Sequence, residues 1–217
     1  MAVSSAAQAA DEPAVALAFN LGVSSDYVFR GITQTDENPQ VYGGVDATIG
    51  KAYVGFWTSN VDFGNSTSAE FDIYGGFKPT LGMVSLDLGA IYYGYANKPS
   101  GPDEAYWEFK AAGTVPAGSG TIGAAVYYSP EFFGETGTAV YYEGNAAFPI
   151  PNTKLTVSGA VGYQWFDAGG SYTTWNLGAG FAATDHLSFD LRYWDSNDDV
   201  YGTQSDARVV VGAKVTF

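Results

Sequence analysis

The sequence predicts an all-β protein: a single closed antiparallel transmembrane β-barrel of about 12 strands, with short periplasmic turns and longer acidic extracellular loops. Runs of about ten residues alternate apolar and polar side chains along the chain. The connections between these runs are alternately short and long, as in bacterial outer-membrane barrels. Aromatic residues reach 16% and charged residues only 15%, whereas an average soluble domain has about 25% charged residues.

The composition limits the other classes of protein. The 217 residues suit one all-β domain. No run of about 18 apolar residues could form a transmembrane helix. Cysteine is absent, so no disulfide framework and no thiolate metal site are expected, and no cofactor is predicted. The net charge of -14 argues against nucleic acid as a partner.

The first ten residues differ from the rest of the chain. They are small and apolar and end in Ala7-Gln8-Ala9-Ala10, which is similar to the cleavage end of a signal peptide without its basic region. We interpret residues 1–10 as a signal-peptide remnant or a disordered N-terminus, and residues 11–217 as the barrel domain.

The first half of the chain contains six alternating runs. In the first run, Val15, Leu17 and Phe19 share one face, because successive strand side chains point to opposite sides. The later runs follow the same rule; Phe71 and Ile73, for example, oppose Asp72. The six predicted strands cover residues 13–23, 41–49, 52–59, 70–78, 84–93 and 106–115.

The second half repeats the pattern and ends on a strand at the final residue. That last run places Val209, Val211 and Val215 on one face and Arg208 and Lys214 on the other. Its pairing with the first run would close the barrel and leave no open edge in lipid. The six predicted strands cover residues 122–128, 140–148, 155–165, 175–181, 187–194 and 207–217.

The connections sort into two ends. If Phe217 lies at the periplasmic end, the short connections are turns on that side and the long ones are loops on the other. The predicted turns are residues 50–51, 79–82, 116–119, 151–152 and 184–185. The predicted loops are residues 24–40, 62–69, 96–104, 129–137, 167–171 and 195–206.

The outward-facing aromatic residues gather at these two ends, as interfacial girdles do. The turn ends carry Phe77, Phe148, Phe181 and Phe217, and the loop ends carry Tyr92, Tyr128, Tyr163, Trp165 and Tyr193. This arrangement predicts a protein of the Gram-negative outer membrane, with outer-membrane lipid and lipopolysaccharide as its surroundings.

Polar and charged side chains occupy the inward faces. They form either a salt-bridge network that holds a narrow barrel, with charges facing one another across the lumen, or a constriction that sorts solutes by charge and size. Inward aromatic rings either fill the lumen or provide a stacking track. The candidates for lining a pore are Arg30, Tyr42, Asp46, Trp57, Asp72, Tyr74, Asp87, Glu108, Lys110, Glu143, Asp190, Arg192, Arg208 and Lys214.

The segment 24–40 is the least periodic part of the chain. Its residues 25–27 and 29–32, with Gln34 and Pro39, resemble the opening of the TorF-family porins of proteobacteria. The resemblance continues in the blocks 43–46, 55–63 and 70–76. The resemblance is strong over residues 20–76 and implies an outer-membrane porin, with no substrate or catalytic residue to transfer. Within this segment, Asp26 and Arg30 form either a loop-anchoring ion pair or a gate in which Arg30 reaches into the lumen.

The pattern favours a porin that passes small polar solutes, with a mild cation preference because loop carboxylates such as Asp195, Asp198, Asp199 and Asp206 lower the potential at the mouth. A structural or surface-interaction barrel with a plugged lumen is the main alternative, and a soluble barrel or sandwich is a weaker one. The C-terminal Phe217 is similar to the aromatic residue that such proteins present to the barrel-assembly machinery.

An enzyme is not expected. The single histidine, His186, falls in a turn at the periplasmic end, and Ser188 points inward. An outer-membrane lipase or protease would need its histidine beside a serine or carboxylates near the outer rim.

Overall fold

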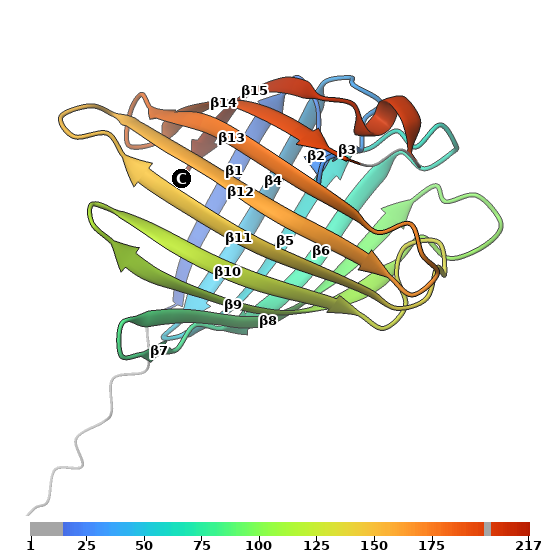
Figure 1. Cartoon of the computed structure of the whole chain (residues 1–217), viewed down its shortest axis with the longest axis horizontal. Helices are drawn as coiled ribbons and strands as arrows, with labels where there is room; N and C mark the ends of the chain where they lie inside the picture. The colour runs from blue at the N-terminus through green and yellow to red at the C-terminus, as the bar shows by residue number, and fades with distance from the viewer. Residues whose placement is uncertain (1–14, 198–200) are drawn as a thin grey trace, which may run out of the picture.

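Twelve long strands close into one antiparallel barrel in the computed structural model, which describes residues 15–197 and 201–217 (Figure 1). The predicted leader 1–10 and the first two residues of the predicted strand 13–23 lie outside this range. The wall is formed by β1 (Val15–Ser24), β4 (Gln40–Ile49), β5 (Ala52–Asn60), β6 (Ala69–Phe77), β8 (Val84–Ala96), β9 (Tyr106–Ala117), β10 (Gly120–Ser129), β11 (Ala139–Pro149), β12 (Leu155–Phe166), β13 (Tyr172–Ala182), β14 (Leu187–Ser196) and β15 (Arg208–Thr216).

The first and last strands pair, and this seam seals the barrel. Asn20 lies opposite Thr216, and the register continues to Ser24 opposite Gly212. At the turn end, Phe19 and Phe217 exchange two backbone hydrogen bonds of 3.2 and 2.9 Å. The predicted 12-strand closure is therefore confirmed.

Four short elements interrupt the connections: β2 (Val28–Phe29), β3 (Ile32–Thr33), β7 (Thr80–Leu81) and the 3-10 helix η1 (Gly202–Ser205). The predicted turn 79–82 was too broad, because Thr80 and Leu81 pair with the start of β8 and the chain reverses at Gly82, where φ is +61°.

The predicted turn 116–119 was also too long. Pro116 and Ala117 belong to β9, and the chain reverses beyond them, where Gly118 has a φ of +60°. Proline is tolerated at this place because a strand end loses only one ladder hydrogen bond to it.

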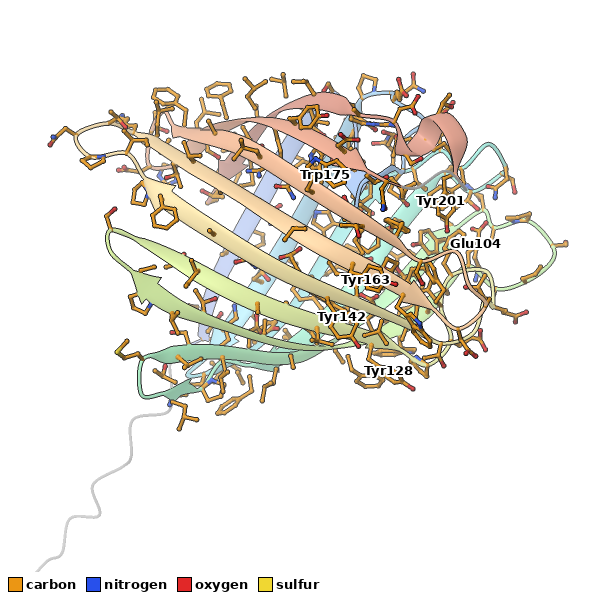
Figure 2. The ribbon with its side chains drawn as sticks, viewed as in Figure 1. Glu104, Tyr128, Tyr142, Tyr163, Trp175 and Tyr201 are labelled. Atoms are coloured by element: carbon orange, nitrogen blue, oxygen red, sulfur yellow. The ribbon has the colours of Figure 1, made fainter. Side chains whose placement is uncertain are left out.

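The outer surface of the barrel is apolar. Leu17, Leu177 and Val209 are each about 60% exposed, and exposed apolar side chains continue around the wall. Soluble monomers rarely expose a contiguous apolar patch beyond a few hundred Å², so this belt is suited to lipid. Figure 2 shows Tyr128 and Tyr163 on the outer wall toward the loop end. The protein is therefore a transmembrane barrel of the outer-membrane type, as predicted.

No helix in the described part of the chain is long and apolar enough to cross a membrane.

Inward tyrosines lie flat against the inner wall because glycine faces them on the neighbouring strand. A Cβ atom added to Gly22 would lie 2.3 Å from Cζ of Tyr42, and one added to Gly55 would lie 2.3 Å from Cε2 of Tyr74. Only a residue without a side chain permits this approach. These rings therefore pack along the wall instead of crossing the lumen.

Candidate functional site: a hairpin inside the lumen

The segment 25–39 joins β1 to β4 and folds into the lumen. Its strands β2 and β3 form a two-residue hairpin, and both tip residues have positive φ, +49° at Arg30 and +86° at Gly31. Two positive φ angles are typical of the tight turns that match the twist of paired strands. Arg30, Ile32 and Thr33 are all buried, and Figure 1 shows β2 and β3 within the barrel toward its loop end.

The tip of this lumen hairpin contacts the wall formed by β9 to β13. Arg30 donates two parallel hydrogen bonds of 2.7 and 2.8 Å to the carboxylate of Glu108 on β9. It donates a third, of 3.1 Å, to the side-chain oxygen of Gln164 on β12. Paired, two-point contacts of this kind are among the strongest hydrogen bonds of arginine. Because β1 and β4 hold the base of the hairpin, the hairpin crosses the lumen.

Aromatic rings complete the surroundings of the Arg30 guanidinium. Its central carbon lies 4.3 Å from the ring centre of Tyr141 and 5.0 Å from that of Tyr127, on β11 and β10. Both distances lie within the range of cation–π attraction. Burial alone lowers the pKa of Arg30, but the Glu108 carboxylate more than offsets this effect and raises the pKa above its ordinary value. Arg30 therefore stays charged inside the barrel.

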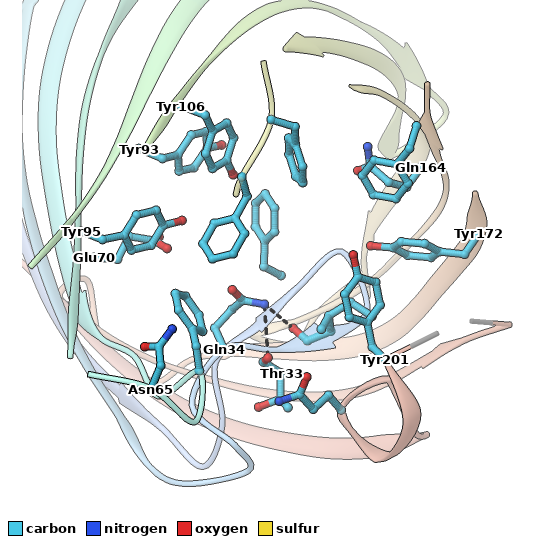
Figure 3. A pocket seen from close by; sticks show the side chains of 17 residues that line it. Thr33, Gln34, Asn65, Glu70, Tyr93, Tyr95, Tyr106, Gln164, Tyr172 and Tyr201 are labelled. Carbon is cyan, nitrogen blue, oxygen red and sulfur yellow. Dashed lines mark hydrogen bonds between the residues drawn. The ribbon is translucent and has the colours of Figure 1, made fainter. Parts of the chain in front are cut away.

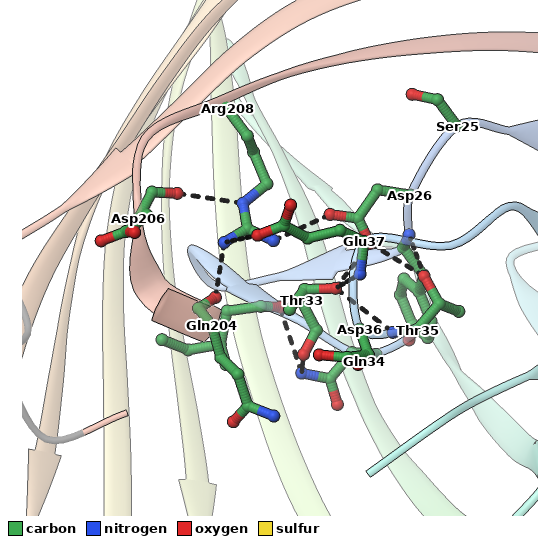
Figure 4. Close-up of polar contacts among 12 residues, drawn as sticks. Ser25, Asp26, Thr33, Gln34, Thr35, Asp36, Glu37, Gln204, Asp206 and Arg208 are labelled. Carbon is green, nitrogen blue, oxygen red and sulfur yellow. Dashed lines mark hydrogen bonds and ion pairs between the residues drawn. The ribbon is translucent and has the colours of Figure 1, made fainter. Parts of the chain in front are cut away.

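The base of the hairpin is held by Asp26, whose carboxylate accepts hydrogen bonds from three side chains (Figure 4). The hydroxyls of Thr33 and Thr35 donate to Oδ1 at 2.6 and 2.8 Å. Arg208 of β15 donates to Oδ2 at 3.0 Å. Asp26 is 5% exposed and Thr35 is fully buried, so these bonds form away from bulk solvent.

The predicted ion pair between Asp26 and Arg30 is wrong. The hairpin carries Arg30 across the lumen to Glu108 and leaves Asp26 at the seam strand, where Arg208 neutralises it. The other hypothesis, that Arg30 reaches into the lumen, agrees with the observed position. The segment 24–40 is thus mainly a lumen element rather than an external loop.

Two ion pairs between the predicted inward residues form along the wall, which corrects the expectation that these charges face one another across the lumen. Lys110 contacts Asp87 at 2.7 Å between the neighbouring strands β8 and β9. Arg192 contacts Asp190 at 3.1 Å, two residues away on β14. Neighbouring strands are about 4.8 Å apart. A partner on the same or the adjacent strand is therefore closer than a partner on the opposite wall of the barrel.

Four inward strand carboxylates, those of Asp46, Glu70, Asp72 and Glu143, have no basic partner among the described residues. Asp46 accepts a hydrogen bond of 2.8 Å from the Tyr74 hydroxyl, and Glu143 accepts one of 2.9 Å from the Asn145 amide. One oxygen of Asp72 is buried without a hydrogen-bond partner. Two inward lysines, Lys78 and Lys214, also lack an ion-pair partner, so the described inner wall has more acidic than basic groups without one.

Two connected spaces lie on the turn side of the hairpin. One has a volume of about 430 Å³ and is lined by Lys214; the other, of about 310 Å³, is lined by Trp57. Tyr42, Asp190 and Arg192 line both spaces. Together the two spaces extend from Lys154 at the turn end to Asp26 at the base of the hairpin.

A third space, which we call the vestibule, lies on the loop side of the hairpin and has a volume of about 260 Å³. Ten of the 17 residues that line it are aromatic (Figure 3). Phe63, Phe132 and Phe133 come from connections whose aromatic residues had no assigned role in the sequence. The Phe-Phe pair in an otherwise polar loop was the one available signal.

The residues with described positions hold no cluster of three or more histidine, aspartate or glutamate side chains arranged for a metal ion. His186 lies at the turn end, where its Nδ1 is 2.8 Å from the carbonyl oxygen of Thr216.

Comparison with known proteins gives a family and a fold. A family model described as "Bacterial protein of unknown function (Gcw_chp)" matches residues 7–217. No curated protein sequence matches. Among solved structures, the KdgM porin, which is also known in complex with disordered oligogalacturonate, has a TM-score of 0.65 at 9% identity; the match covers 92% of this chain and 99% of that one.

Two other solved structures share the architecture. The NanC porin has a TM-score of 0.61 at 9% identity, over 93% of this chain and 99% of that one. The COG4313 outer membrane channel from Pseudomonas putida F1 has a TM-score of 0.56 at 9% identity, over the whole of both chains. At these identities the likeness concerns the fold, which is that of outer-membrane porins and channels.

Proposed function

The chain belongs to the Gcw_chp family of bacterial proteins of unknown function, and from its architecture we propose that it is an outer-membrane channel for the passive diffusion of small polar solutes. The observation that carries the proposal is the space on both sides of the lumen hairpin in a closed barrel. In this proposal the lumen hairpin is the constriction, and Arg30 and Glu108 fix its position.

The charge of the wall supports a mild preference for cations. The ion pairs of Arg30, Lys110, Arg192 and Arg208 each neutralise a carboxylate. The acids without a basic partner are Asp46, Glu70, Asp72 and Glu143, and they outnumber the unpaired inward lysines, Lys78 and Lys214. A lumen with excess negative charge attracts cations and repels anions.

The resemblance of residues 20–76 to the TorF-family porins agrees with a channel. The acidic loops at the mouth would add to the cation preference. Of the loop carboxylates named above, Asp198 and Asp199 lie outside the described part of the chain.

We also propose that the protein is not an enzyme, since His186 is placed at the turn end and bonded to the backbone.

A plugged structural barrel is the second candidate, and the burial of the hairpin favours it. Arg30 and Thr33 are 7% and 4% exposed and Thr35 is fully buried. A segment so well held could seal the lumen permanently. The two candidates differ in a single property, the permeability of the folded barrel.

Permeability can be measured on the purified barrel. In planar bilayers with a KCl gradient, a channel gives discrete conductance steps and a reversal potential on the cation-selective side. Liposome swelling with small sugars and amino acids gives the size limit. Silent bilayers and no uptake of any solute, from protein shown to be folded, would support the plugged barrel and overturn the channel.

A further inference from the structure

The vestibule has the composition of a ligand site. Phe63, Tyr95 and Phe133 pack edge to face, with ring centres 5.3 to 5.6 Å apart. Beside them, Tyr93 and Tyr106 stack at 4.5 Å. Figure 3 shows Tyr95 and Glu70 on one side of the space and Tyr172 and Tyr201 on the other. A concave aromatic surface with a few polar groups is typical of small-molecule sites.

The lining of the vestibule contains an acidic residue and no basic one. Glu70 is the single charged residue among those that line the space, and neither lysine nor arginine is present there. Glu70 is 2% exposed, and the Tyr27 hydroxyl donates a hydrogen bond of 2.8 Å to its carboxylate. An aromatic surface that contains one carboxylate attracts a cation with apolar groups, because the faces of the rings are also electronegative.

The same barrel already binds a cation in this way. At the tip of the hairpin, the Arg30 guanidinium lies against the rings of Phe29, Tyr127 and Tyr141 and pairs with Glu108. Phe29 also lines the vestibule. The vestibule repeats these components, aromatic rings and a buried carboxylate, without an arginine to occupy it.

We infer that the vestibule binds small organic cations whose charged nitrogen carries alkyl or aromatic groups, such as choline. The assignment of these cations as cargo rests on the proposed channel function, whereas their binding does not. A neutral sugar would use the rings but not Glu70, and an anionic solute would be repelled by it.

Binding can be measured by calorimetry on the folded barrel in detergent. The probes are choline, its uncharged isostere 3,3-dimethylbutan-1-ol and galactose. We expect choline to bind about tenfold more tightly than the isostere, because cation–π attraction and the Glu70 carboxylate act on the charge alone. Equal affinity for choline and its isostere, tighter binding of galactose, or no binding of choline would overturn the inference.

Two substitutions locate the site. Glu70→Gln keeps the shape and an oxygen acceptor for Tyr27, and should weaken choline binding about fivefold. Glu143→Gln is the matched control, since it removes an inward carboxylate that does not line the vestibule, and should leave choline affinity within about twofold of the parent value. Equal effects of the two substitutions would place the cation elsewhere in the lumen.

Conductance in the same preparation separates this inference from the proposed function. Choline that binds to a barrel without conductance would overturn the channel and leave the site in place. A conducting barrel that does not bind choline would overturn the site and leave the channel in place. If both hold, choline added on the loop side should reduce the potassium current more strongly than choline added on the turn side.

Discussion

Arg30 and Glu108 are 78 positions apart in the chain and meet inside the barrel through two parallel hydrogen bonds of 2.7 and 2.8 Å. Their side chains are 6% and 1% exposed. This pair joins the tip of the lumen hairpin to β9, so the position of the constriction depends on it. Removing one partner from such a pair leaves the other charge buried and uncompensated.

Glu108→Gln should therefore lower the free energy of unfolding by about 3 kcal/mol. The temperature at which the folded band disappears in a heat-modifiability gel, with chemical unfolding in detergent for the free energy, measures the loss. The double variant Arg30→Met, Glu108→Met should recover much of the stability because no charge then remains buried. A Glu108→Gln barrel as stable as the parent protein would contradict the importance of this pair.

Asp26→Ala should loosen the base of the hairpin, because Thr33, Thr35 and Arg208 all lose their acceptor. The expected result in planar bilayers is a larger and noisier single-channel conductance. Asp103→Asn is the control, since it disturbs an exposed pair with Lys98 and lines none of the three spaces. A conductance trace of Asp26→Ala that matches the parent trace would mean that the base does not set the aperture.

Gly31→Ala should displace the hairpin tip from the wall. The residue has a φ of +86°, and an added Cβ atom would lie 2.4 Å from Oγ1 of Thr174. Gly137→Ala is the matched control, because Gly137 has a φ of +81° but no neighbour within 4 Å of an added Cβ. The control should lose about 1–2 kcal/mol from the backbone alone. Gly31→Ala should lose more and should also change the conductance.

The uncompensated carboxylates should set the cation preference. Replacing Asp46 and Glu143 by asparagine and glutamine removes two negative charges and should move the reversal potential in a KCl gradient toward zero. The control Asp87→Asn, Lys110→Met removes a paired acid and base and keeps the net charge. A reversal potential that is unchanged by the first substitution and shifted by the second would contradict this account.

Deletion of Phe217 should reduce the amount of assembled barrel in outer membranes, since we propose that this residue is presented to the assembly machinery. The deletion also removes the two backbone bonds to Phe19. Phe217→Ala keeps those bonds and separates the two effects. Assembly in cells should fall for both variants, whereas refolding into detergent should fall only for the deletion.

The barrel itself was predictable because the alternation of apolar and polar side chains that defines each strand can be read from neighbouring residues. Alternation along a run such as 207–217 reports which face meets lipid, and the surrounding lipid requires every strand to be paired. The same logic predicted that Arg208 and Glu108 point inward. A two-residue element such as β7 has too few residues for alternation to show, and it was predicted as part of a turn.

The partners of the inward side chains were not predictable. Arg30 could pair with Asp26 nearby in sequence or with any of several lumen carboxylates, and only the three-dimensional path of the hairpin selects Glu108. The vestibule was missed for a related reason. Its rings, such as Phe63 and Phe133, come from separate connections, whose relative positions no local pattern encodes.

The seam between β1 and β15 also determines when the protein can fold. Its partners are the first and last strands of the barrel, with Asn20 of β1 opposite Thr216 of β15. Until β15 has been synthesised, β1 keeps an unpaired edge, which is costly in lipid and prone to aggregation in water. Closure of the barrel must therefore follow the synthesis of β15, the strand made last of the twelve.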